Sequence, residues 1–496
     1  MVTEFKRRIA RGSIYGKLML LIGVLIAVPL ILLLFYPQEA YHAPSFMLPS
    51  AVLLVSGTAA CFVRKRKREA HEWQSALQKG SLPVLFAWFC GIVTGAAPFV
   101  ISSQLNVTHA LFESVSGWTA TGLTVADTEA LPHIFLFHRS FMQYCGGLGF
   151  ILMILMLVGG KQATNLFSAE GHSDRLMPNI RSTGHTIFLI YNGFLTAGTL
   201  LYVLFGMPLF DAVCHTMSAL STAGFTTQPG NIGAYTSFPI EAVTILLMLI
   251  GSTNFAVLLL LTQFKLKKLF RVSEVRFMFV LVAVFTPLIA FSLTHGTGMS
   301  TLKSLHQALF SVVTAFTTTG YTTANYTSWP PFAIGLLILL MIIGGSAGST
   351  AGGIKLLRVY FLTKISFANI RKRLSPSRRV TVLHYYRAQG KTPIDSTMIA
   401  DTLCFVFFYT LVLITGTLLI TLTEGCSLFD ALFEFASAFG TSGISNGLTG
   451  SSAKTGTLIV EMAGMLLGRL EIFIVFIGIQ VGISKIRYTA QAALKK

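Results

Sequence analysis

The chain has 496 residues, of which 53% are hydrophobic and only 11% are charged. Because soluble domains carry charge on about a quarter of their residues, this composition excludes an ordinary soluble protein and predicts one that lies in a lipid bilayer. The formal net charge of +18 does not indicate nucleic-acid binding, because most lysines and arginines gather in alternate loops, as on the cytoplasmic side of membrane proteins.

Ten apolar segments are long enough to cross a bilayer, which takes about 20 helical residues. In chain order they cover residues 17–36, 45–64, 82–103, 134–160, 185–206, 238–262, 275–295, 331–360, 396–423 and 455–483. The first is too long for the apolar region of a cleaved signal peptide. The alternation of basic loops predicts that both termini are cytoplasmic.

One pattern of sixteen residues occurs four times, at 109–124, 211–226, 307–322 and 430–445. The copies align without a gap on the glycines Gly122, Gly224, Gly320 and Gly443. A repeat kept in register fixes the architecture. We expect an all-α polytopic membrane protein in which four fused helix–pore loop–helix repeats surround one ion pore with pseudo-fourfold symmetry. An N-terminal two-helix hairpin precedes them.

The predicted units follow from the positions of the copies. They are the N-terminal hairpin with its cytoplasmic loop (1–81), and repeats at 82–184, 185–274, 275–392 and 393–496. The third repeat contains the basic segment 371–391, which is either a docking surface or a solvated loop that faces lipid headgroups.

Each copy begins with a helix of about 11 residues, which rises about 16 Å and cannot cross the bilayer. We therefore expect four re-entrant segments that enter from outside. Asp211 and Asp430 open the second and fourth segments, where they suit helix N-caps. Glu113 and Glu434 lie nine residues before their glycines and either hydrogen-bond behind the loop or attract cations; the sequence leaves both roles open.

The short run before each glycine suits cation coordination. Rings of backbone carbonyls can replace the hydration shell of an ion, and glycine adopts the positive φ that such loops need. Close packing of small residues is the alternative. We expect main-chain oxygens to hold the ion at Thr119, Ala120, Thr121, Gly122, Ser221, Thr222, Ala223, Gly224, Thr317, Thr318, Thr319, Gly320, Gly440, Thr441, Ser442 and Gly443.

These motifs resemble the Trk/Ktr/HKT superfamily of potassium transporters. The resemblance rests on TATGLT, STAGFT, TTTGYT and GTSGIS, with GGSAGSTAGGIKLLR (344–358) and GMLLGRLEIF (464–473), and the N-terminal pair resembles the bacterial Trk transmembrane subunit. It implies potassium uptake across the bacterial inner membrane, K+ as the bound and transported ion, and no organic cofactor. It also implies a homodimer on a cytosolic ring of RCK-type nucleotide-binding proteins.

Three alternatives stay open within transport: a sodium-permeable protein, a proton- or sodium-coupled symporter of the same fold, and the potassium-binding subunit of a P-type pump. An enzyme is not expected, because no H-E-x-x-H, paired-Asp or G-x-S-x-G context appears. The fourth loop departs most from the others, with Gly440 where they carry Thr or Ser.

The segment 344–353 should break its helix, because each glycine costs a helix about 1 kcal/mol relative to alanine. Its glycines are Gly344, Gly345, Gly348, Gly352 and Gly353. The resemblance implies an intramembrane gating loop here, and a small-residue packing face is the alternative. Arg469 lies inside the last apolar segment, so it needs a partner or a wet cavity. The resemblance implies that it faces the pore below the filter; pairing with Glu471 or Glu461 is the alternative.

Overall fold

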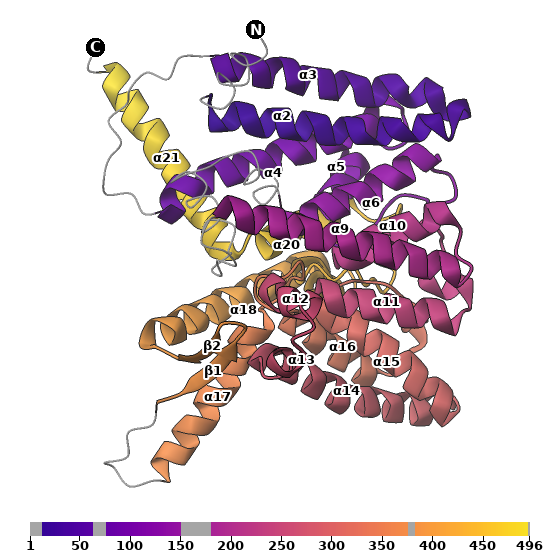
Figure 1. Cartoon of the computed structure of the whole chain (residues 1–496), viewed down its shortest axis with the longest axis vertical. Coiled ribbons are helices and arrows are strands. Elements are labelled where there is room, and N and C mark those ends of the chain that lie inside the picture. Colours follow the sequence, from indigo (N-terminus) through magenta and orange to yellow (C-terminus); the bar gives the residue numbers. More distant parts are fainter. Residues whose placement is uncertain (1–11, 63–75, 150–179, 375–381, 495–496) are drawn as a thin grey trace.

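The computed structural model describes residues 12–62, 76–149, 180–374 and 382–494. Within these ranges the chain is helical apart from its loops and one antiparallel hairpin, formed by β1 (His384–Arg387) and β2 (Gly390–Pro393). The long helices lie side by side in one bundle, and α17 leaves it on the same side as the end of α21 (Figure 1).

The N-terminal hairpin packs on the first repeat. It consists of α2 (Ile14–Ala27), η1 (Val28–Leu34), η2 (Pro37–His42) and α3 (Ala43–Phe62). Glu39, in the turn, accepts hydrogen bonds from the backbone N–H groups of His133 (3.0 Å) and Ile134 (2.9 Å). These are the first residues of α6, so the hairpin supplies that helix with an acidic cap.

The four predicted repeats follow with helices in the same order. Repeat 1 contains α4 (Ala76–Ile101), α5 (Val107–Trp118) and α6 (His133–Leu148). Repeat 2 contains α9 (Ile180–Leu204), α10 (Leu209–Leu220), η3 (Asn231–Tyr235), α11 (Phe238–Gly251), α12 (Phe255–Thr262) and α13 (Leu266–Leu269). Repeat 3 contains α14 (Ser273–Thr297), α15 (Thr301–Thr317), η4 (Tyr326–Ser328), α16 (Pro331–Ile343) and α17 (Leu356–Arg373). Repeat 4 contains α18 (Ser396–Glu424), α19 (Leu428–Phe439), α20 (Thr455–Arg469) and α21 (Ile472–Leu494).

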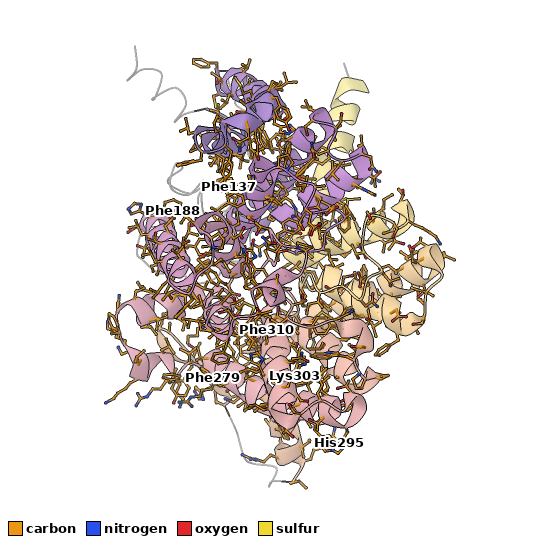
Figure 2. The ribbon with its side chains drawn as sticks, turned by 90° about the vertical axis from the view of Figure 1, so that its right-hand side faces the viewer. Phe137, Phe188, Phe279, His295, Lys303 and Phe310 are labelled. Atoms are coloured by element: carbon orange, nitrogen blue, oxygen red, sulfur yellow. The ribbon has the colours of Figure 1, made fainter. Side chains whose placement is uncertain are left out.

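Seen along the bundle, the repeats surround a common centre (Figure 2). Phe310 of α15 is fully buried near that centre, whereas Phe279 of α14 is 47% exposed on the outside. Large apolar side chains such as Phe407 on α18 are also exposed. An apolar outer surface is unfavourable in water but suits contact with lipid.

The second helix of each repeat, the pore helix, is too short to cross a bilayer. α5, α10 and α19 have 12 residues each, which rise about 18 Å. α15 has 17 residues, more than the predicted length, because it begins at Thr301, before the start of the repeated pattern.

The third helix of each repeat, which we call the inner helix, is not one straight span in repeats 2 and 4, where single apolar segments were predicted at 238–262 and 455–483. Among the described residues, six helices are long and apolar enough to cross a membrane. The pair α11 and α12 is bent by 119° and the pair α20 and α21 by 99°, so up to eight spans are present if each bent pair counts as one. The segment 331–360 breaks after Ile343, and the segment 134–160 continues beyond the described residues.

The inner helices end or bend at a shared glycine. Gly146, Gly251, Gly344 and Gly468 each lie thirteen residues after the first residue of α6, α11, α16 and α20. A Cβ added at Gly146 or Gly468 would overlap a backbone carbonyl at the end of the pore helix in the same repeat. Only glycine allows so close an approach, which brings α6 and α20 against the ends of α5 and α19.

Candidate functional site

All four pore helices end in the same backbone motif. The residue two before each glycine has positive φ, at 56°, 51°, 54° and 50° for Ala120, Thr222, Thr318 and Thr441. The next N–H group in each repeat donates to the carbonyl oxygen five residues earlier, at 2.8–3.0 Å. This is a Schellman motif, but with a non-glycine residue in the left-handed position, which costs about 1–2 kcal/mol. The sequence offered no signal for it, since positive φ was expected only at the glycines.

The four glycines of the repeated pattern meet in a closed ring. Their φ values are 97°, 73°, 84° and 79° for Gly122, Gly224, Gly320 and Gly443. A Cβ added at any one of them would overlap the carbonyl oxygen of the residue that precedes the glycine of the next repeat. The glycine of the fourth repeat meets the first repeat in this way, which closes the ring. The overlapped oxygens belong, in this order, to Ala223, Thr319, Ser442 and Thr121. The predicted convergence of the four loops therefore holds, and we call residues 119–122, 221–224, 317–320 and 440–443 the filter loops.

A cavity of about 200 Å³ lies against this ring. All four glycines line it, together with the hydroxyl residue two positions after each glycine, namely Thr124, Thr226, Thr322 and Ser445. Among the described residues, no group of three His, Cys, Asp or Glu side chains could hold a metal ion. The lining offers oxygens of the backbone, of hydroxyl groups and of the Asn231 amide.

Two buried carboxylates hold the chain just after the first and fourth filter loops. Glu113 accepts hydrogen bonds from Thr124 Oγ1 (2.5 Å) and from the N–H groups of Val125 (2.7 Å) and Ala126 (3.0 Å). Glu434 does the same in the fourth repeat with Ser445 Oγ (2.5 Å) and the N–H group of Asn446 (3.1 Å). Both residues thus make hydrogen bonds behind the loop, which is one of the two roles that the sequence left open.

The prediction that Asp211 and Asp430 are helix N-caps is wrong. The caps are Pro208 and Ser427, and each aspartate is the third residue of its helix. Asp430 exchanges hydrogen bonds with Ser427, in the manner of a capping box. Asp211 instead accepts from Thr227 Oγ1 (2.7 Å) and Tyr235 Oη (2.9 Å), and so fastens the chain after the second filter loop.

The glycine-rich segment 344–353 breaks the helix as predicted and lies against three filter loops. Thr350 Oγ1 is 3.0 Å from Thr222 Oγ1, and the N–H group of Gly352 donates to Thr318 Oγ1 at 2.9 Å. A Cβ added at Gly352 would overlap the carbonyl oxygen of Gly440. Gly344, Gly348 and Gly353 have positive φ, whereas the other two glycines, Gly345 and Gly352, do not.

The residues at the break between α11 and α12 anchor this segment. Neither this break nor these contacts were predicted from the sequence. Ser346 N–H donates to the Ser252 carbonyl at 3.0 Å, and Asn254 Nδ2 donates to the Ala347 carbonyl. Glu274, in the first turn of α14, accepts from the N–H group of Ala347 at 2.9 Å. The S-T-N run inside an apolar segment was the available signal, because polar residues there suit a helix break.

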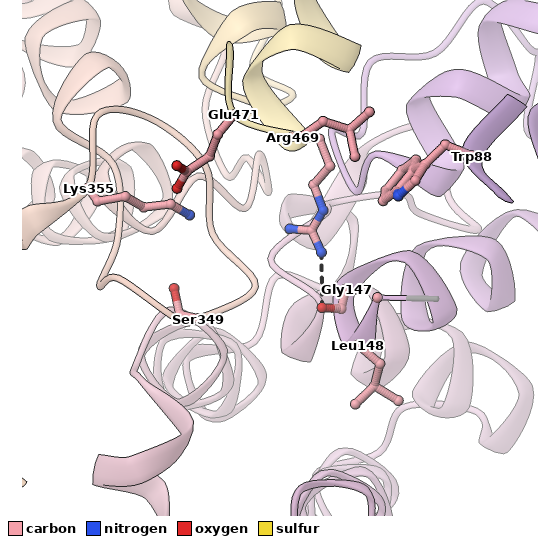
Figure 3. Close-up of a pocket in the computed structure, with 10 residues that line it drawn as sticks. Trp88, Gly147, Leu148, Ser349, Lys355, Arg469 and Glu471 are labelled. Carbon is pink, nitrogen blue, oxygen red and sulfur yellow. Dashed lines mark hydrogen bonds between the residues drawn. The ribbon is translucent and has the colours of Figure 1, made fainter. Parts of the chain in front are cut away.

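Arg469 ties the segment to α6 (Figure 3). Its guanidinium donates to the carbonyl oxygens of Thr350, Gly146 and Gly147, the last at 3.0 Å. It lines a cavity of about 50 Å³ with Lys355 and Glu471. Glu471 accepts from Arg358 at 2.9 Å, and Glu461 from Thr449 at 2.8 Å.

The comparisons with known proteins cover nearly the whole chain. A family described as TrkH, cation transport protein, matches residues 42–482. The Trk system potassium uptake protein TrkG of Escherichia coli is 31% identical, over 93% of this chain and 96% of that protein. The protein TrkH of Vibrio parahaemolyticus is 32% identical, over 94% and 96%. The crystal structure of the potassium transporter TrkH from Vibrio parahaemolyticus superposes with a TM-score of 0.81 at 28% identity, over 95% of this chain and 98% of that one. The chain therefore belongs to the TrkH family of cation transport proteins, which are not enzymes.

Proposed function

We propose that this chain takes up potassium ions across a bacterial inner membrane through the ring of filter loops. The observation that carries the proposal is the closed ring of Gly122, Gly224, Gly320 and Gly443, with a cavity lined by all four. The relatives named as potassium uptake proteins support the choice of ion. K+ is the cargo, and the chain needs no organic cofactor for this role.

The chemistry follows from the ends of the pore helices. α5, α10, α15 and α19 all finish at the filter loops, so each turns the negative end of its helix dipole, about half an elementary charge, toward the ring. Main-chain carbonyls of the sixteen filter-loop residues replace the hydration shell of K+. Glu113 and Glu434 hold the loops in place from behind.

The segment 344–353 acts as the gate in this proposal, and Arg469 holds it closed. Its contacts with Thr222, Thr318 and Gly440 obstruct the way from the ring to the other side of the bundle. The positive charge of Arg469 beside the same route adds an unfavourable interaction with a cation. Opening requires the release of Thr350 from both Thr222 and Arg469.

Regulation and assembly belong to the same proposal. The chain forms a homodimer and sits on a cytosolic ring of RCK-type nucleotide-binding proteins, with both termini in the cytoplasm. The exposed basic end of α17, at Arg371, Lys372 and Arg373, offers a surface for that contact. Reconstitution with a purified cytosolic partner, with uptake measured with and without nucleotide, tests this part.

Uptake in a bacterial host that lacks its own potassium transporters tests the main proposal. Wild type should restore growth at limiting K+ and take up radiolabelled rubidium with little competition from sodium. Gly320→Ser should abolish the rescue or admit sodium, because its side chain would overlap the Ser442 carbonyl. Gly298→Ser is the matched control, since Gly298 has a similar φ of 70° and open space around it. Failure of wild type to take up K+ or rubidium would contradict the proposal.

A further inference from the structure

The second filter loop carries a side-chain clamp. Gln143, on α6 of the first repeat, donates from Nε2 to the carbonyl oxygen of Ala223 at 2.9 Å. Its Oε1 accepts from the N–H group of Phe225 at 3.1 Å. The amide therefore bridges the two peptide groups on either side of Gly224, as a neighbouring β-strand would. Both bonds are fully enclosed, because Gln143 is 0% exposed.

The other repeats carry methionine at this position. Gln143 lies ten residues after the first residue of α6, and the same count from the starts of α11, α16 and α20 reaches Met248, Met341 and Met465. These three side chains are also 0% exposed. Methionine matches glutamine in length but offers no N–H donor. The clamp is therefore a departure from fourfold symmetry at one loop.

Arg139, one turn before Gln143 on the same face of α6, extends the clamp. Its guanidinium lies 4.1 Å from the centre of the Phe225 ring and donates to the carbonyl oxygen of Thr226 at 3.4 Å. It also forms a buried ion pair with Glu113 at 2.9 Å. Glu113 in turn holds the chain after the first filter loop. One helix face thus holds the chain from Ala223 to Thr226, at the end of the second filter loop and just after it, and ties it to the first repeat.

We propose that Gln143 is a positioning residue that sets the preference for K+ over Na+ by holding the second filter loop. This inference rests on the proposed function. Na+ is the smaller ion, so a loop must move inward to coordinate it, and the clamp on both sides of Gly224 resists that movement. The amide donor also competes with the ion for the Ala223 oxygen and lowers its field strength, which disfavours the smaller ion further.

The test is Gln143→Met, which gives the first repeat the residue that the other three carry. Full-length protein in liposomes is assayed for uptake of rubidium and sodium over a range of concentrations. We expect the ratio of the KM for Na+ to the KM for Rb+ to fall about tenfold, the size of one or two net hydrogen bonds, with the maximal rubidium rate largely retained. A residue that served only the stability of the fold would lower the amount of active protein and leave this ratio unchanged.

The control is Asn192→Leu, which removes an amide on α9 that bonds only to its own helix, at the Phe188 carbonyl, among the hydrogen bonds of the described chain. Gln143→Leu carries the same prediction should Gln143→Met not reach the membrane. An unchanged ratio in a selective, active Gln143 variant would overturn this inference and leave the proposed function standing. A wild-type protein that carries neither K+ nor rubidium would overturn both.

Discussion

Gly122→Ala tests whether ion binding needs the close packing of neighbouring filter loops around the ring. Gly122 has a φ of 97°, and its added Cβ would overlap the Ala223 carbonyl of the next repeat. Gly206, between α9 and α10, has nearly the same φ of 93° but nothing within 4 Å of the added Cβ. The two substitutions share the backbone strain, about 1–2 kcal/mol, and only the first forces neighbouring backbone to move, at a further cost of about 1–3 kcal/mol.

The assay is the midpoint of thermal unfolding of purified protein, with and without K+. A ligand at about 100 times its dissociation constant stabilises the folded state by about 2.7 kcal/mol. We expect K+ to raise the midpoint of wild type and of Gly206→Ala but not of Gly122→Ala, because the distorted ring no longer offers its oxygens. Equal stabilisation of all three proteins by K+ would show that the ion does not bind in the ring.

Three further substitutions test the supports of the site. Asn254→Asp keeps the acceptor that caps α12 but removes the donor to the Ala347 carbonyl. We therefore expect segment 344–353 to be held less firmly and rubidium uptake to be a fewfold faster. An unchanged rate would argue against Asn254 as an anchor of this segment. Arg469→Gln removes a positive charge and bonds to three carbonyls, so the maximal rate should rise while the ion preference stays constant, and unaltered kinetics would exclude a gating role. Glu434→Gln places an amide against the N–H groups that donate hydrogen bonds to the carboxylate. We expect the free energy of unfolding to fall by about 1–3 kcal/mol and K+ binding to weaken. A variant as stable as wild type would show that these hydrogen bonds are dispensable.

The ring of glycines could be predicted because its signal is local and occurs four times. Gly122 and its equivalents stand at one register in four aligned segments, and each needs a conformation that only glycine adopts at low cost. The break at residues 344–353 was equally visible, because five glycines in ten residues cannot sustain a helix.

The supports of the ring could not be predicted, since they depend on contacts between distant segments. Gln143 meets Ala223, and Asn254 meets Ala347, only after the repeats have packed together. The left-handed residues, such as Ala120, carry no mark in the sequence because the surrounding motif imposes their strain. Apolar length likewise cannot distinguish a continuous span from the bent pair of α20 and α21.

Locating the bound ion would show directly whether the four filter loops coordinate K+. Crystals of the full-length protein grown in rubidium would reveal each ion by its anomalous scattering. We predict a peak on the axis between Gly122, Gly224, Gly320 and Gly443, within coordination distance of backbone oxygens from all four filter loops. Peaks only elsewhere in the protein, with the ring empty in a transport-competent preparation, would contradict it.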